Sequence, residues 1–381
     1  MKKIAIVNRT NFKNFGSVLQ CLALCNTVEK LGYSSEIIWC KGGLSKNFDI
    51  RPRKVLSSLL RAVFHPHFLM EIAENIKFVS TKKYSVEEEK LFEEFIENNI
   101  RQQKYTWREL CRMSDKDSPY SAFICGSDQI WCSTSLYVDP MLYLRFAPER
   151  KRIAYAPSIG RDYIPGYNRR IMKRYVSEIP YLSIREDCGC ELVHELTGKE
   201  VVQVLDPTLL IDKDEWVSLS RNVALPESYC LCYFLDTASP EVQRNILAYS
   251  QERGLKIVAL GCTLPEIPED LITYPSCGPA EFLAVISRAA AVFTDSYHGM
   301  LFSIIFRKNF LAIPRNYIKY DQSSRQRSVL NMLGLSMRYG SDFSLVDGSI
   351  DYNAVNKKID MQRQVSLSFL KSAILGMENG K

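Results

Sequence analysis

"FTDSYHGML", residues 293–301, places a histidine between an apolar run and an apolar helix. The residues before it, 289–293, form a short unbroken apolar stretch typical of a strand that is buried on both faces. The residues after it, 300–306, predict a buried helix that begins just after Gly299. We therefore expect His298 at the carboxyl end of a parallel strand, facing a helix N-terminus, where α/β sheets bind ligands and backbone N–H groups favour anions.

Strand and helix patterns alternate along almost the whole chain. Residues 3–8 indicate a strand, 17–31 a helix closed by Gly32, and 34–40 a second strand, which together form a βαβ unit with a right-handed crossover. The second half repeats this alternation and ends with a strand at 309–313. The pattern predicts an α/β fold with two doubly wound Rossmann-like domains that face each other across a cleft.

The chain of 381 residues is too long for one core of ordinary size. We place an N-terminal α/β domain at 1–175, with a basic helical insert at about 41–100. A C-terminal α/β domain follows at 176–345, and a helix within 346–381 is expected to pack back on the domains. A loop rich in Pro, Gly and Tyr at 162–167 indicates where the boundary lies.

Neither a membrane span nor an export signal is expected. The first apolar run ends after four residues at Asn8, and no window approaches the length of a membrane-spanning helix. The twelve cysteines fall within apolar segments and lack zinc-site spacing, which favours reduced core thiols and no structural metal. The expected location is the cytoplasm.

The net charge of +6 is modest, and much of it lies in a basic amphipathic segment at 51–83. We favour a solvated helical pair that covers the sheet with its apolar stripe. Such a segment can also lie on an anionic surface, so peripheral contact with the inner face of the membrane stays open as an alternative. No nucleic-acid partner is expected, and the oligomeric state is left open.

Three polar side chains follow predicted strands. Asp128 lies after 120–125, Arg185 after 181–184, and His298 after the strand quoted above. Each has an ordinary alternative role: Asp128 as a helix cap, Arg185 in a surface ion pair, and His298 as a structural histidine. Three such groups at three strand ends nevertheless favour a site between the domains. The chain has neither a G-x-G-x-x-G nor a P-loop motif, which disfavours a classical dinucleotide or nucleoside triphosphate site.

Several segments of the chain resemble, in order, the signature segments of the polysaccharide pyruvyl transferase family. The amino-terminal stretch "NFGSVLQCLAL" at 14–24 looks like the first loop and helix of that family. The other matching segments are GSDQIW at 126–131, FAPERKRIAYAPSIG at 146–160, SIRED at 183–187, VLDPTLLI at 204–211 and FTDSYHGMLFSIIFRKNF at 293–310.

The resemblance implies transfer of a pyruvyl unit from phosphoenolpyruvate to two hydroxyls of a sugar, free or lipid-linked, with release of phosphate. It also implies the two-domain fold of many nucleotide-sugar glycosyltransferases. The chemistry of this transfer requires no redox cofactor, and a metal is optional at most. The donor-binding acid, arginine and histidine of the family carry over onto Asp128, Arg185 and His298. Some members have an arginine two residues before the histidine, where this chain has Ser296.

His298 is the expected general acid toward the methylene carbon of the donor, and Asp128 the base toward, or the orienting group for, the attacking hydroxyl. The missing arginine requires another cation, for which Arg315, Lys319 and Arg325 are candidates. The other expected donor-site residues are Gly126, Ser127, Ser296, Tyr297, Gly299, Lys319 and Arg325, and the expected acceptor-site residues are Asn14, Gly16, Trp131 and Ser158.

Two alternatives remain at this point. A nucleotide-sugar glycosyltransferase of the same shape would use Asp128 or His298 as its base. A carbohydrate-binding protein without catalytic activity would keep the scaffold and bind an acceptor without releasing phosphate.

Overall fold

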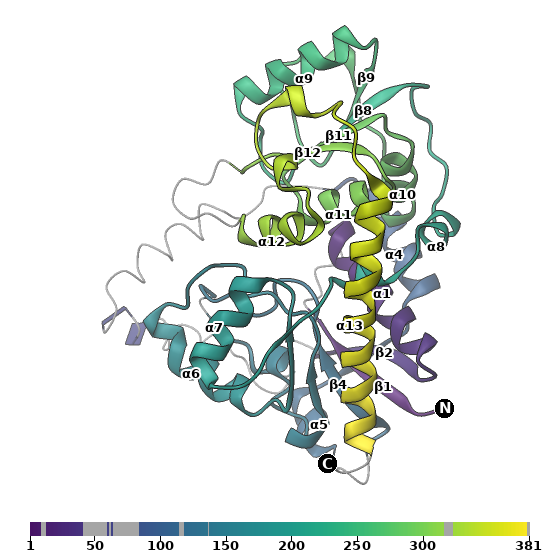
Figure 1. The fold of residues 1–381 in the computed structure, drawn as a ribbon. Coiled ribbons are helices and arrows are strands. Elements are labelled where there is room, and N and C mark those ends of the chain that lie inside the picture. The colour runs from purple at the N-terminus through teal and green to yellow at the C-terminus, as the bar shows by residue number, and fades with distance from the viewer. Residues whose placement is uncertain are drawn as a thin grey trace.

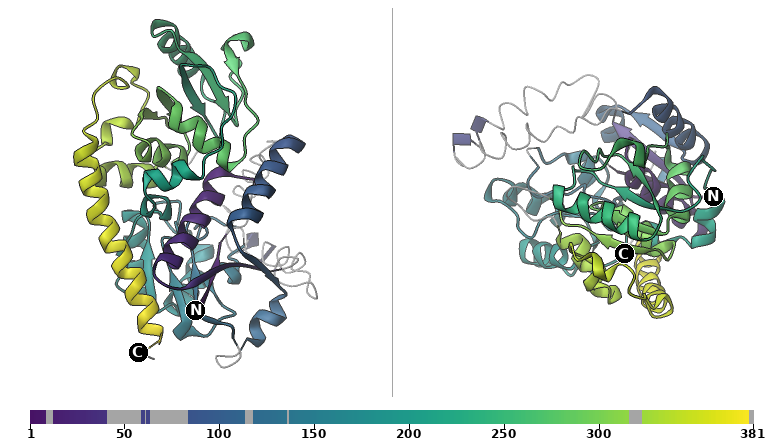
Figure 2. Two further views of the ribbon diagram at one scale, coloured as in Figure 1. Left: turned by 90° about the vertical axis from the view of Figure 1, so that its right-hand side faces the viewer. Right: turned by 90° about the horizontal axis from the view of Figure 1, so that it is seen from above.

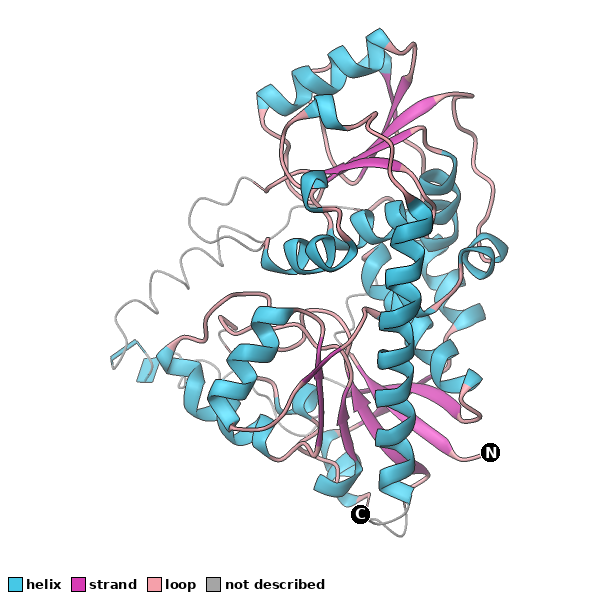
Figure 3. Ribbon diagram, in the orientation of Figure 1, coloured by secondary structure: helices cyan, strands magenta, loops and turns pink. Residues whose placement is uncertain are grey.

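The computed structural model describes residues 1–8, 13–40, 59–60, 62–63, 84–113, 118–135, 137–315 and 323–378. Two parallel sheets, each flanked by helices, lie one above the other (Figures 1 and 3). The predicted α/β class with two doubly wound domains is confirmed. In both sheets the strand order reverses next to the first strand, which creates the switch point where such folds bind ligands.

The first sheet contains seven described strands in the order β3-β2-β1-β4-β5-β6-β7, all paired in parallel. Its switch point lies between β1 and β4. The strands are β1 (Lys3–Val7), β2 (Ser34–Cys40), β3 (Gln102–Tyr105), β4 (Tyr120–Cys125), β5 (Arg152–Ala154), β6 (Tyr181–Ile184) and β7 (Val202–Gln203). The helices are α1 (Phe15–Lys30), α4 (Val86–Asn99), α5 (Trp107–Arg112), α6 (Gly166–Ser177) and α7 (Asp187–Thr197).

The second sheet contains five described strands in the order β10-β9-β8-β11-β12, also all parallel, with its switch point between β8 and β11. The strands are β8 (Tyr229–Tyr233), β9 (Lys256–Leu260), β10 (Ile272–Thr273), β11 (Ala291–Thr294) and β12 (Asn309–Ala312). The helices around it are α8 (Lys213–Ser218), α9 (Pro240–Glu252), α10 (Pro279–Arg288), α11 (Tyr297–Ile305) and α12 (Ser324–Leu333).

The domain boundary predicted near residue 175 lies too early. Strands β6 and β7, which we assigned to the second domain, belong to the first sheet, because β6 pairs with β5 and β7 pairs with β6. The loop that suggested a linker leads instead into α6, which is the crossover between β5 and β6. The second sheet starts only at β8, after the chain has passed through α8.

The last helix, α13 (Tyr352–Glu378), runs alongside both domains (Figures 1 and 2). Hydrogen bonds attach it to the segment that follows β7. The Ser366 hydroxyl accepts the N–H of Leu205 at 2.9 Å, and Arg363 donates from Nε and Nη2 to the carbonyl of Leu209 at 3.0 and 2.9 Å. This helix therefore fixes the position of the segment that connects the two sheets.

Aromatic packing joins the two domains at the start of α1. Phe15 stacks on Phe92 of the first domain and on Phe282 of the second, with ring centroids 5.2 and 4.7 Å apart. One apolar cluster includes residues from both sheets. The two switch points are therefore held in a fixed relation by a shared core.

Part of the predicted basic insert forms α4, but the segment proposed to touch a membrane, 51–83, lies almost entirely outside the described residues. In the described ranges, no helix is both long and apolar enough to span a bilayer.

Replacing Phe15 with alanine tests the shared core. We expect the free energy of unfolding to fall by about 3–5 kcal/mol, because the change removes a buried ring that contacts both domains. Val86 is exposed, so Val86→Ala serves as the control and should change the free energy of unfolding by less than about 0.5 kcal/mol. Urea unfolding of the three proteins provides the measurement. Equal stability of Phe15→Ala and Val86→Ala would contradict the assignment.

Candidate functional site

His298 lies in the first turn of α11. The helix begins at Tyr297, so the predicted start after Gly299 is wrong. The reason is Ser296, which caps the helix through a hydroxyl that accepts the N–H of Gly299 at 3.3 Å. The imidazole therefore projects from the start of the helix at the switch point of the second sheet.

The first turn of α1 packs directly against the His298 ring. A Cβ atom on Gly16 would lie 2.2 Å from His298 Nδ1, so only glycine allows this approach. Asn14 caps the same helix, with its side-chain oxygen accepting the N–H of Ser17 at 3.1 Å. Two residues predicted to bind an acceptor, Asn14 and Gly16, thus shape the contact between α1 and the imidazole.

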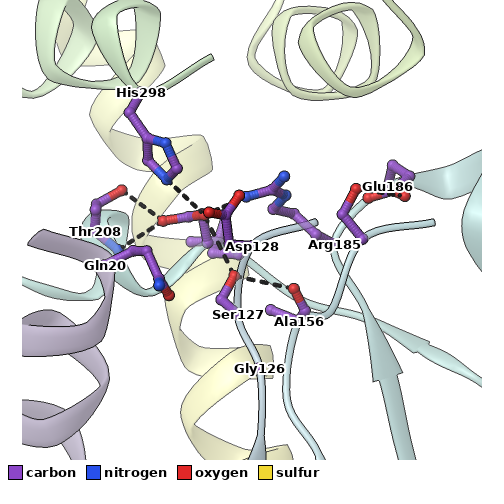
Figure 4. A network of polar contacts seen from close by, with 12 residues as sticks. Gln20, Gly126, Ser127, Asp128, Ala156, Arg185, Glu186, Thr208 and His298 are labelled. Carbon is purple, nitrogen blue, oxygen red and sulfur yellow. Dashed lines mark hydrogen bonds and ion pairs between the residues drawn. The ribbon is translucent and has the colours of Figure 1, made fainter. Parts of the chain in front are cut away.

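A buried carboxylate, Asp206, connects the two predicted cations. Its Oδ2 accepts a hydrogen bond from Arg185 Nη1 at 2.7 Å and lies 3.5 Å from His298 Nε2. Its Oδ1 accepts from the backbone N–H and the hydroxyl of Thr208 at 3.0 and 2.8 Å. The side chains of Arg185 and Asp206 are 1% and 0% exposed. Figure 4 shows His298, Arg185 and Thr208 converging at this point.

Asp206 is the functional residue that sequence reasoning missed. It lies in the segment VLDPTLLI that carried the family resemblance, at an Asp-Pro turn directly after the first sheet. Burial alone would raise its pKa, but attraction to His298 and to the charge of Arg185 outweighs burial and lowers it well below the ordinary value. Asp206 therefore stays ionised beside Arg185 and His298.

Asp128 lies at the other switch point, directly after β4. Its backbone is left-handed, with φ of 68°, and its Oδ2 accepts the Ser17 hydroxyl at 2.9 Å. Burial would raise the pKa of Asp128, but attraction to His298 and Arg185 lowers it below the ordinary value. The structure thus brings Asp128, Arg185 and His298 together, as predicted from the three strand ends.

Two arginines contact the ring of Tyr297. The Arg185 guanidinium lies 4.0 Å from the ring centroid, and the Arg325 guanidinium, from α12, lies 5.8 Å from it. Burial, followed by repulsion from Arg185 and Arg315, lowers the pKa of Arg325. Several buried polar atoms here have no hydrogen-bond partner in the described part of the chain: Arg185 Nε and Nη2, Arg325 Nε, the Tyr297 hydroxyl, and His298 Nε2.

These unpaired groups indicate a polar site that can bind a ligand. Leaving buried donors unsatisfied costs about 1–3 kcal/mol each, so native proteins rarely do so without a functional reason. Because the guanidinium groups are positive and crowded, the ligand that suits the site is an anion with several oxygen atoms.

Of the three candidates for the missing arginine, Arg325 is the one with a buried, unused donor. Arg315 is bound to Asp295, with Nε 3.2 Å from Oδ2. The Asp295 carboxylate also accepts the N–H groups of Leu235 and Asp236 at 2.6 and 3.0 Å, so this pair closes the end of β8. Lys319 lies outside the described residues.

Trp131 and Ser158 do not face an acceptor site. Trp131 is fully buried, stacks on Tyr143 with centroids 5.0 Å apart, and donates its Nε1–H to the carbonyl of Leu142 at 3.0 Å. Ser158 is also fully buried and donates to Glu186 Oε1 at 3.0 Å. The predicted acceptor contacts at these two positions are therefore wrong, because both side chains are part of the interior.

Gly126, Ser127 and Gly299 support the site rather than line it. A Cβ on Gly126 would lie 1.8 Å from the carbonyl oxygen of Tyr155, and one on Gly299 2.5 Å from Thr294 Oγ1. The Ser127 hydroxyl donates to the carbonyl of Ala156 at 3.0 Å (Figure 4). Ser296 likewise uses its hydroxyl as the helix cap. In the ranges that the structure describes, no group of three or more His, Cys, Asp and Glu side chains has the geometry of a metal site.

Solved structures of other proteins resemble this fold. The UDP-GlcNAc 2-epimerase of Methanocaldococcus jannaschii is 11% identical, with a TM-score of 0.51 over 94% of this chain and 92% of that chain. MurG of Acinetobacter baumannii is 8% identical, with a TM-score of 0.43 over 100% of this chain and 95% of that chain. At such identities the likeness concerns the fold alone.

No curated protein matches the chain in sequence. A family model does match, over residues 14–317, and its description is polysaccharide pyruvyl transferase. The match includes Asp128, Arg185, Asp206 and His298, all of which the structure places in one site. This chain belongs to the polysaccharide pyruvyl transferase family.

Proposed function

We propose that the protein transfers a pyruvyl group from phosphoenolpyruvate to two hydroxyls of a sugar, in a polysaccharide or its lipid-linked precursor. The products are a pyruvate ketal and inorganic phosphate. The observation that carries this proposal is the pair of buried arginines, Arg185 and Arg325, which hold unused N–H donors at the ring of Tyr297, the residue before His298. Phosphoenolpyruvate is a small, highly charged anion with a carboxylate and a phosphate, and it suits such a site.

One edge of the Arg185 guanidinium, formed by Nε and Nη2, can bind the donor. Asp206 accepts from Nη1, which leaves Nε and Nη2 unpaired on the same side of the guanidinium. These two N–H groups are parallel and match the two oxygens of a carboxylate or phosphate. Arg325 adds a second guanidinium on the same tyrosine ring, which serves the other anionic group of the donor.

His298 supplies the proton that starts the reaction. The proton passes to the methylene carbon of phosphoenolpyruvate, and the positive charge that develops at C2 is attacked by the first sugar hydroxyl. Asp206 Oδ2 lies 3.5 Å from His298 Nε2 and holds the orientation of the imidazole ring. Asp128, an ionised carboxylate, accepts the proton of the attacking hydroxyl.

The C2–O bond to phosphate then breaks, and the second hydroxyl attacks C2 to close the ketal ring. Two hydroxyl protons are lost in total. One replaces the proton that was given to the new methyl group, and the other leaves with inorganic phosphate. Atoms and charge therefore balance without an oxidant or a reductant.

Replacing His298 with alanine tests the general acid. Phosphate release from phosphoenolpyruvate, with a panel of galactosides, glucosides and mannosides as acceptors, should fall by about 10²–10⁴-fold, which is the usual contribution of a positioned proton donor. The exposed His194→Ala is the matched control and should keep wild-type turnover. Near-normal turnover of His298→Ala would rule out the assigned role.

The Asp206 carboxylate should make stability depend on pH. Its pKa is lower in the folded state than in the unfolded state, so its contribution is present above about pH 4 and is lost as the pH falls. Asp206→Asn should cost about 3–5 kcal/mol at pH 7, because it leaves Arg185 buried without its counter-ion.

The stability gap between wild type and Asp206→Asn should shrink by about 1 kcal/mol between pH 5 and pH 3. Urea unfolding at each pH measures this gap. The exposed Asp214→Asn is the control, and it should stay close to wild type at every pH. A gap of constant size for Asp206→Asn would show that its charge does not stabilise the fold.

A further inference from the structure

A hollow of about 570 Å³ lies beside the outer strand β10 of the second sheet, away from the residues discussed above. It is formed by the loop between β9 and β10, by Ile272 at the start of β10, and by Tyr274, which directly follows β10. Strands β9, β8 and β11 are parallel neighbours, so this loop leaves the sheet at the same carboxyl edge as the segment that carries His298. The spacing of neighbouring strands places the end of β9 about 10 Å from the end of β11.

The hollow has a fixed shape. Leu264 and Ile267 are buried and form an apolar floor, and the Ile267 N–H donates to the Leu264 carbonyl at 3.0 Å. The loop is attached to α9 through the buried side chain of Gln243, which accepts the N–H of Glu266 at 2.9 Å. Gln243 is itself held by a hydrogen bond from its Nε2 to the carbonyl of Ala238 at 2.7 Å.

The lining of the hollow distinguishes it from the arginine-rich site. The Tyr274 ring is 46% exposed, and the carboxylates of Glu266 and Glu269 stand nearby on the same loop. None of the described residues that line the hollow is a lysine or an arginine. Glu266 has a counter-ion in Arg244, whose Nη1 lies 3.8 Å from its Oε2, and no lysine or arginine of the described lining is left to bind a phosphate or carboxylate. A neutral sugar ring fits, because its C–H face can stack on the tyrosine and its hydroxyls can donate to the carboxylates.

We propose that this hollow binds a pyranose unit of the acceptor saccharide, next to or beyond the unit that receives the pyruvyl group. The inference rests on the proposed function, because that function requires a saccharide acceptor beside His298. A saccharide that reaches both places must have at least two sugar units, since the two places are separated by more than one ring. Binding of the remote unit orients the reacting hydroxyls.

Saturation-transfer NMR with lactose, cellobiose and mannobiose tests the hollow directly. At least one of these disaccharides should receive saturation from the wild-type protein. The signal should fall about fivefold in Tyr274→Ala, as expected for the loss of an aromatic stacking partner. Glu269→Gln keeps the shape of the hollow but removes a charged acceptor, and it should also reduce the signal. The exposed Met337→Ala is the control and should leave the signal unchanged.

Equal signals from wild type, Tyr274→Ala and Glu269→Gln would overturn the proposal, as would the absence of signal with all three disaccharides. A signal from uridine that is lost in Tyr274→Ala, without one from the sugars, would assign the hollow to a nucleoside instead and would also overturn it.

Thermal unfolding with phosphoenolpyruvate separates this inference from the proposed function. The donor should raise the melting temperature of wild type and Tyr274→Ala alike, because Tyr274 is not part of the arginine site. If the donor stabilises both proteins while the NMR signals are insensitive to Tyr274, the inference alone fails. If the donor stabilises neither, the proposed function fails, and the NMR result still decides whether the hollow binds sugar.

Discussion

The candidate site depends on one buried carboxylate that contacts both a guanidinium and an imidazole. Asp206 accepts from Arg185 at 2.7 Å and faces His298 Nε2 at 3.5 Å, while Thr208 satisfies its other oxygen. A buried guanidinium without a counter-ion would be strongly unfavourable. Because Asp206 satisfies only one nitrogen of Arg185, the remaining donors stay available for a ligand. The same carboxylate thus balances the charge of Arg185 and leaves Nε and Nη2 without a hydrogen-bond partner in the described part of the chain.

The architecture explains why these groups meet. Both sheets reverse their strand order beside their first strand, and Asp128 and His298 follow the strands at these two switch points. The carboxyl ends of parallel strands lie at one edge of the sheet, so the polar side chains that follow these strands lie close together in each domain. Phe15 packs against both domains at this junction, and Gly16, the next residue, lets α1 approach the imidazole.

Sequence reasoning placed Asp128, Arg185 and His298 correctly, because each follows an apolar run that is long enough to indicate a buried strand. It missed Asp206, because an aspartate before a proline also suits an ordinary turn or helix cap, and only the fold shows that it lies between Arg185 and His298. Trp131 and Ser158 were assigned to the acceptor site, although both are buried, because burial of an individual side chain depends on packing that no local pattern reveals. The prediction of a domain boundary near residue 175 was wrong for a related reason, because only strand pairing shows that β6 belongs to the first sheet. The role of Arg325 depends on how α12 packs, which periodicity cannot provide.

Calorimetric titration with phosphoenolpyruvate tests the central claim most directly. We expect the wild-type protein to bind it at one site, and Arg325→Met to bind it about 10–100-fold more weakly, as the loss of a hydrogen bond to a charged group predicts. UDP should produce no comparable heat. Equal affinity of the two proteins for phosphoenolpyruvate, or binding of UDP in preference to it, would contradict the account.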